Sequence, residues 1–137
     1  IGRGFDYPAL LEASLKLKEI SYIHCEAFAS GELKHGTIAL ISKGTPVIAL
    51  MTQRMLAQKQ ISNIKEVMSR KASVITFIKK SLVTSAVHCD FELPDLDDDF
   101  MIMPSVVALQ LLAYYVSSDK GLDVDKPRNL AKVVTVE

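Results

Sequence analysis

Three charged residues near the start of the chain, Glu12, Lys16 and Glu19, have a spacing that could support acid–base chemistry. They lie four and three positions apart, so on a helix their side chains meet on one face. Such a face is commonly solvated, with ion pairs worth about 0.2–0.5 kcal/mol each. The other lines of the same predicted helix are largely apolar, as at Leu10 and Leu17, which favours a charged line that faces a cleft.

A histidine and a C-terminal group of cations are further candidates. His35 stands beside glycine in the polar segment 31–36, where water access would suit proton transfer near neutral pH. The competing interpretation is a loop histidine without a chemical role. Arg128 and Lys132 lie in the tail and could bring a guanidinium and an amine to an anionic ligand, unless the tail is simply a frayed terminus.

The sequence predicts neither a metal site nor a cofactor. His24–Cys25 and His88–Cys89 are adjacent pairs, whereas zinc ligands are usually two to four positions apart. The acidic stretch 95–99 lacks the glycine and the distal glutamate of a calcium-binding loop, so we expect a solvated turn there.

Composition excludes several classes of protein. The chain has 137 residues with 16 basic and 16 acidic side chains, so it lacks the basic excess of proteins that bind nucleic acids through phosphates. Nearly half of the residues, 49%, are hydrophobic, which excludes a disordered segment. No uninterrupted apolar run reaches the roughly 18–20 residues of a membrane span. Two cysteines are too few for a disulfide framework and indicate buried thiols in a reducing, cytoplasmic compartment.

The elements that must position these residues alternate between strands and helices. We expect a helix over 8–24, a second over 53–70, and a third over 104–120 that is apolar nearly all round and is therefore buried or at a contact. Strands are expected over 46–51, 73–78 and 87–93, and residues 1–4 read as the end of a strand whose earlier part is absent. This order predicts an α/β fold, a three-layer αβα sandwich with a mostly parallel sheet. Residues 1–121 would form the domain and 122–137 a tail.

Several stretches together resemble the second sugar-isomerase (SIS) domain of the glutamine–fructose-6-phosphate aminotransferase family, the glucosamine-6-phosphate synthases. The matching segments lie in the first helix, the histidine loop, the last helix and the tail: 15–24, 26–27, 31–36, 109–114, 123–132 and 134–137. The likeness covers both ends of the chain and is weakest over 81–104. Thr37, Ser14 and Val133 depart from the family pattern without removing a residue that has an assigned role.

The resemblance implies a role for each matched residue. The family makes glucosamine 6-phosphate from fructose 6-phosphate and glutamine-derived ammonia, without a cofactor. Lys132 matches the lysine that forms a Schiff base with the open-chain ketose. Glu19 matches the carboxylate that moves a proton between C1 and C2, and Lys16 matches a lysine that assists at the sugar hydroxyls.

The remaining matched positions concern substrate binding and assembly. Glu12, Arg128 and Ala131 correspond to the substrate-binding surroundings, and Arg128 would favour a partly deprotonated lysine amine. His35 matches the histidine that opens the sugar ring, presented to the neighbouring subunit of a homodimer with shared sites. The phosphate-binding loop and the glutamine-hydrolysing domain lie elsewhere in the family's polypeptide, so we expect this chain alone to be inactive. Two alternatives stay open: a non-catalytic sugar-phosphate-binding SIS regulatory module, and a purely structural dimerisation module built on the apolar last helix.

Overall fold

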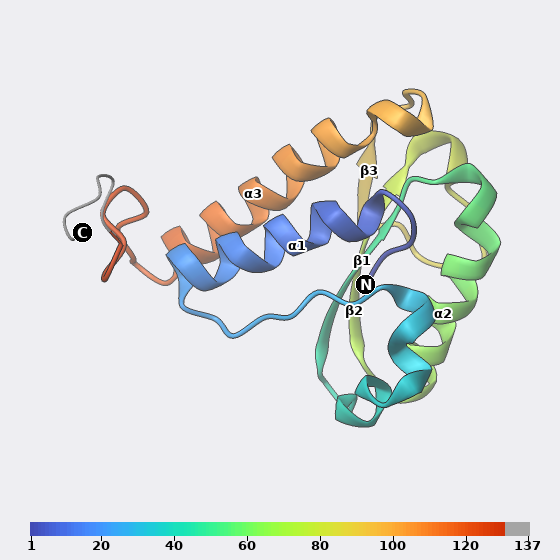
Figure 1. Ribbon diagram of the computed structural model, residues 1–137, viewed down its shortest axis with the longest axis horizontal. Helices are drawn as coiled ribbons and strands as arrows, with labels where there is room; N and C mark the ends of the chain where they lie inside the picture. The colour runs from blue at the N-terminus through green and yellow to red at the C-terminus, as the bar shows by residue number, and fades with distance from the viewer. Residues whose placement is uncertain (131–137) are drawn as a thin grey trace.

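A parallel sheet of three strands forms the centre of the computed structural model, which describes residues 1–130. The strands are β1 (Pro46–Met51), β2 (Ser73–Lys79) and β3 (Phe91–Leu93), in the order β1-β2-β3. Helices α1 (Asp6–Lys16) and α3 (Ile102–Asp119) cover one face of this sheet, and α2 (Ala57–Ser69) covers the other (Figure 1). The predicted three-layer αβα sandwich with a parallel sheet is therefore confirmed.

The unbroken apolar character of β1 and β2 follows from this double cover. Leu50 and Phe77 point into a core cluster shared with α1 and α3, whereas Ala49, Met51 and Ile78 point into a cluster shared with α2. Because both faces of each strand are buried, neither strand alternates polar and apolar side chains. These two strands and the helix between them match the predicted ranges closely.

Short helical segments complete the chain between the main elements. The π-helical turn η1 directly continues α1, and five 3-10 turns lie in the connections. Their bounds are Leu17–Ser21 for η1, Ser30–His35 for η2, Thr37–Leu40 for η3, Arg54–Leu56 for η4, Lys80–Leu82 for η5 and Asp98–Phe100 for η6. The segment η4 with α2 accounts for the helix that the sequence predicts over 53–70.

The opening residues extend the sheet beyond β1. The Ile1 nitrogen donates to the Ile48 carbonyl (2.5 Å), and the Leu50 amide donates to the Ile1 carbonyl (3.1 Å). Gly2 forms a parallel bridge with Ala29 on its other side. The predicted strand end over residues 1–4 is not formed as a strand, because pairing is limited to these bonds at Ile1 and Gly2 and a turn begins at Gly4.

Helix α3 is buried on one side only. Ser105, Leu109, Ala113 and Ser117, each four positions apart, are buried, while the opposite side is exposed. The region Asp98–Asp119 is long and apolar enough to cross a membrane by length and composition alone, but its buried side packs on α1. Its apolar character thus reflects a buried side plus an exposed apolar side.

The predicted strand over 87–93 is only partly formed, since β3 comprises just Phe91–Leu93. Side chains replace the expected backbone ladder before it. The Thr76 hydroxyl donates to the His88 carbonyl (2.7 Å), and the Thr76 amide donates to the Asp90 carboxylate (2.8 Å). The Asp90 carboxylate therefore accepts the bond that a strand carbonyl would accept, and the backbone pairing of β2 with β3 begins only at Phe91.

The prediction of a solvated turn at the acidic stretch 95–99 is wrong for Asp98, whereas Asp95 is exposed as predicted. Lys79, at the end of β2, has a side chain only 1% exposed, and its Nζ lies 2.8 Å from Asp98 and 3.6 Å from Asp95. Asp98 also accepts the Arg54 amide (2.7 Å). Burial raises the pKa of Asp98, but the bonds from Lys79 and Arg54 outweigh it and hold that pKa below its usual value. The loop is thus fixed across the ends of β1 and β2 by a buried cation.

Candidate functional site

Helix α1, which carries the charged line, is fixed at its start to the end of β1. Asp6, in the first turn, is buried and accepts hydrogen bonds from the Thr52 amide (3.0 Å) and the Thr52 hydroxyl. Burial raises the pKa of Asp6 to about 6, and the two Thr52 bonds only partly oppose this. The helix then runs away from the strand ends with Ala9, Leu10 and Ala13 buried beneath it. This packing directs its charged line outward.

The three charged residues of that line meet as the spacing predicts. Lys16 Nζ lies 2.6 Å from Glu19 Oε2 and 3.7 Å from Glu12 Oε1. All three side chains are between a quarter and about a third exposed, so they remain accessible to a ligand. The hydrogen bond from Lys16 to Glu19 is the main cause that raises the pKa of Lys16. The carboxylate of Glu19 is therefore held by a fixed cation.

Glu19 lies on the π-helical turn η1, which ends the helix earlier than the predicted residue 24. The Ser21 hydroxyl donates to the Leu17 carbonyl (2.5 Å), and Lys120 from the end of α3 donates to the Ser21 carbonyl (2.6 Å). Tyr22 then adopts a left-handed backbone with φ 58°. π-Helical turns within α-helices occur frequently at functional sites.

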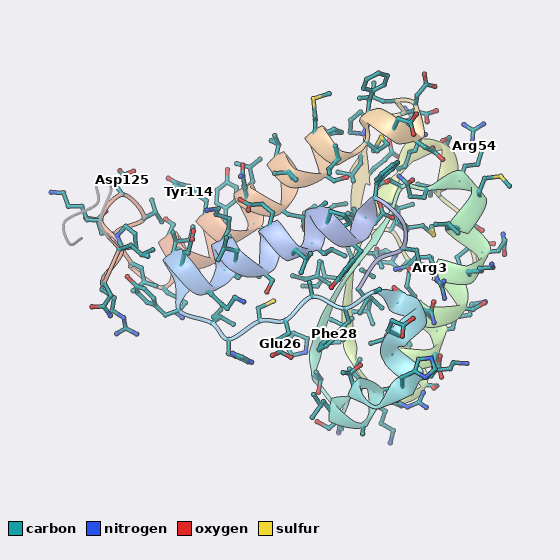
Figure 2. The ribbon with its side chains drawn as sticks, viewed as in Figure 1. Arg3, Glu26, Phe28, Arg54, Tyr114 and Asp125 are labelled. Atoms are coloured by element: carbon teal, nitrogen blue, oxygen red, sulfur yellow. The ribbon has the colours of Figure 1, made fainter. Side chains whose placement is uncertain are left out.

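An open hollow of about 470 Å³ lies beside this turn. Glu19 and Tyr22 line one side, and Arg128 and Leu130 of the tail line the other. The structure thus brings two predicted site residues, Glu19 and Arg128, to one hollow, and the tail lies beyond the end of α3, as Asp125 shows in Figure 2. Lys16 is connected to the hollow by its ion pair with the lining residue Glu19, and Glu12 by its ion pair with Lys16. Lys132 and Ala131 lie outside the described residues.

His35 lies apart from this hollow. It belongs to η2, which packs beside α2, whereas η1 lies at the other end of the coil that joins them (Figure 1). The His35 side chain is 74% exposed, and its nearest acid is Glu32 at 3.9 Å. Within one chain, His35 and Glu19 therefore do not line a common cavity.

Tyr22 is a residue that sequence reasoning missed. The Arg128 guanidinium stacks over the Tyr22 ring, 4.1 Å from its centroid, and the Arg128 amide donates to the Tyr22 hydroxyl (2.8 Å). Nothing in the sequence signals this contact, because the partners are 106 positions apart.

Residues 1–130 contain no group of three or more His, Cys, Asp and Glu side chains arranged to hold a metal ion. A second hollow of about 250 Å³ is lined by Arg54, Met55, Lys79, Asp97 and Asp98. Its buried lysine and Asp98 already bind one another.

Comparison with known proteins matches residues 1–117 to the SIS domain family. The whole chain is 55% identical to a glutamine–fructose-6-phosphate aminotransferase (isomerizing) of Clostridium acetobutylicum, of which it covers 23%. It therefore spans about a quarter of the length of the curated relatives it matches.

Two solved structures share the fold. One is described as the C-terminal domain of glucosamine-fructose-6-phosphate aminotransferase from Francisella tularensis; its TM-score is 0.80 at 45% identity, over 92% of this chain and 36% of that one. The other, a glucosamine-6-phosphate deaminase from Thermotoga maritima, has a TM-score of 0.73 at 29% identity, over 97% and 38% of the two chains.

Proposed function

Because the chain belongs to the SIS domain family, we propose that it forms the C-terminal isomerase part of a glutamine–fructose-6-phosphate aminotransferase. The complete polypeptide would convert fructose 6-phosphate and glutamine-derived ammonia to glucosamine 6-phosphate. The observation that carries this proposal is the Lys16–Glu19 pair at 2.6 Å, with Glu19 facing Arg128 of the tail across one open hollow.

Glu19 is the proton carrier between C1 and C2 of the open-chain sugar. Its carboxylate is a quarter exposed and fixed by Lys16, so it is positioned without being blocked. A side chain that both takes and returns a proton must reach two adjacent carbons, which suits a carboxylate with two equivalent oxygens. Lys16 and Glu12 complete the charged line and bind the sugar hydroxyls.

The tail supplies the nucleophile. Residues 1–121 form the domain and 122–137 a tail that enters the site. The amine of Lys132 attacks the ketone carbon, water leaves, and an imine links the sugar to the chain. Arg128 and Ala131 line the substrate, and the guanidinium of Arg128 favours the neutral amine of Lys132.

His35 serves the neighbouring subunit of a homodimer. Its exposure of 74% and its separation from the Glu19 hollow support a role outside its own chain's site. There it would act as the general acid–base group that opens the sugar ring.

The exposed apolar side of α1 and α3 docks the rest of the polypeptide. The large side chains at this surface are Leu11, Leu15, Met103, Val107, Leu111, Tyr114 and Tyr115, each 44–64% exposed. Figure 2 shows Tyr114 on the outer side of α3. About three quarters of each curated relative lies outside this chain, which provides the partner that such a surface requires. Self-association of the isolated chain through this surface that is lost in the complete polypeptide would support this proposal, whereas self-association through it that persists in the complete polypeptide would assign the surface to a second copy.

We place the protein in the cytoplasm. Cys25 and Cys89 are both free and half-buried rather than fully buried as predicted. Free thiols support a reducing compartment, and microscopy of the tagged polypeptide would test it.

The deciding experiment measures glucosamine 6-phosphate formation by the complete polypeptide. We expect Glu19→Gln to lower kcat at least about 10²-fold, the usual contribution of a general acid–base group. Lys132→Ala should abolish both turnover and borohydride trapping of the sugar, whereas the control Lys126→Ala in the same tail should leave them unchanged. Full activity in Glu19→Gln and Lys132→Ala would refute the proposal. The chain alone should be inactive, and turnover by it would refute the need for the other domains.

A second candidate is deamination of glucosamine 6-phosphate, favoured by the likeness to the Thermotoga maritima deaminase. Ammonia release from glucosamine 6-phosphate without glutamine-dependent synthesis would select it. Sugar-phosphate binding with no turnover in either direction would instead select the non-catalytic regulatory module.

A further inference from the structure

Tyr22 has a backbone conformation that its side chain does not favour. It terminates η1 in the left-handed region, with φ 58° and ψ 24°. This conformation is uncommon for residues other than glycine, asparagine and aspartate, and it is a genuine outlier for a bulky side chain. Such outliers persist where the surrounding structure holds them, and they cluster at functional sites. The contacts of Tyr22 therefore indicate what holds this conformation.

Those contacts all lead to the C-terminal tail. The Tyr22 hydroxyl accepts a hydrogen bond from the Arg128 amide (2.8 Å), and the Arg128 guanidinium carbon lies 4.1 Å from the centre of the Tyr22 ring. One side chain thus binds both the backbone and the cation of a residue 106 positions away. The preceding residue, Ser21, is held by Lys120 at the end of α3 (2.6 Å). The end of η1 is consequently bound at Lys120, where the segment after α3 begins, and at Arg128, farther along the tail.

The position of this contact matters because the tail lysine comes shortly after it in the sequence. Lys132 lies four residues after Arg128 and eleven after Gly121, where α3 has ended. A tail fixed at Arg128 keeps the Lys132 Cα within about 14 Å of the Arg128 Cα. The effective concentration of a tethered group falls roughly as the −3/2 power of the tether length. Shortening the free tether from eleven residues to four therefore raises the concentration of the Lys132 amine near Glu19 about fivefold.

We propose that Tyr22 is a positioning residue, a dock that fixes the tail at Arg128 so that the tail lysine works at the hollow lined by Glu19. This inference rests on the proposed function for the role of Lys132. The ring of Tyr22 supplies the cation–π contact with Arg128, and the Tyr22 hydroxyl accepts the hydrogen bond from the Arg128 amide. The left-handed turn at Tyr22 aims the side chain at the tail, directly after the helical turn that carries Glu19.

The test compares Tyr22→Leu, which removes both contacts, with Tyr22→Phe, which keeps the ring, in the complete polypeptide. Tyr7→Leu, the same change in the first turn of α1, is the matched control. We expect borohydride trapping of fructose 6-phosphate on Lys132 to slow about fivefold in Tyr22→Leu and less in Tyr22→Phe. Turnover should show this loss in kcat rather than in KM, with melting temperatures near that of the wild type. Equal trapping in Tyr22→Leu and wild type, or an equal loss in Tyr7→Leu, would overturn the inference.

A second measurement separates failure of the dock from failure of the proposed function. Trypsin cleaves after arginine, so the rate of cleavage between Arg128 and Asn129 reports how firmly the tail is held. We expect Tyr22→Leu to be cleaved several times faster than wild type and Tyr7→Leu to match wild type. Absence of trapping in the wild type would refute the proposed function but leave this readout intact. Equal cleavage rates in wild type and Tyr22→Leu would refute the dock.

Discussion

Removing the charge of Asp98 should destabilise the chain far more than a change at its exposed neighbour Asp99. The Lys79 ammonium is 1% exposed and has Asp98 at 2.8 Å, with Asp95 farther away at 3.6 Å. Removal of one partner of a fully buried ion pair costs about 3–5 kcal/mol, because the other charge stays buried and uncompensated. Asp98 is 30% exposed and Asp95 would remain, so we expect about 2 kcal/mol for Asp98→Asn.

Urea unfolding followed by circular dichroism measures this loss. Two kcal/mol corresponds to a decrease of about 6–10 °C in melting temperature for a chain of this size. Asp99→Asn, a change in the same loop, should remain within about 0.5 kcal/mol of wild type. Adding Lys79→Met to Asp98→Asn should recover stability, since the buried charge is then gone. Equal stability of Asp98→Asn and Asp99→Asn would show that the buried pair does not hold the loop.

Three further outcomes are expected. Because the pKa of Asp6 is raised to about 6 in the folded state, the protonated Asp6 side chain stabilises the fold fully below about pH 4, and this contribution is lost as pH rises through 6. NMR of the Asp6 carboxyl should give a titration midpoint near 6, and Asp6→Asn should remove this pH dependence of stability. A midpoint near 4 would refute the prediction. Glu19→Gln should cost less than about 1 kcal/mol, because its pair with Lys16 is partly exposed, and a larger loss in thermal melts would indicate a structural role. Thr76→Val should cost about 1–3 kcal/mol in urea unfolding by leaving the Asp90 amide without its partner, and an additive loss with Asp90→Ala would argue against one shared network.

The sequence predicts the core of the fold well where apolar pattern decides the structure. β1 and β2 are unbroken apolar runs because helices cover both of their faces, and α2 shows a regular apolar stripe. The pattern fails at β3, where Thr76 and Asp90 replace ladder bonds with side-chain bonds that periodicity does not register. It fails again at Asp98, since a run of aspartates looks solvated unless the buried partner Lys79 is known.

The candidate site shows the same division. The contact of Glu12, Lys16 and Glu19 depends only on helical spacing within one element, so it could be predicted from local sequence. The meeting of Tyr22 and Arg128 depends on how α3 returns the chain to the end of α1, which no local pattern contains. The π-helical turn at Glu19 also has no residue signature, because it reflects tertiary contacts such as Lys120 to the Ser21 carbonyl.

The location of the hollow differs from the place where an α/β sheet usually binds an anion. In open α/β sheets, ligands usually bind at the carboxyl ends of the strands, where helix amides receive anions. Here that edge is filled from within, because the Asp98 carboxylate takes the Arg54 amide and the buried Lys79. The free hollow lies at the far end of α1, beside Glu19, about 20 Å along the helix from Asp6. Chemistry at Glu19 thus remains possible in this domain while the Arg54 amide and the Lys79 amine at the strand ends are already engaged by Asp98. Under the proposed function, the phosphate of the sugar would therefore be held by another part of the polypeptide.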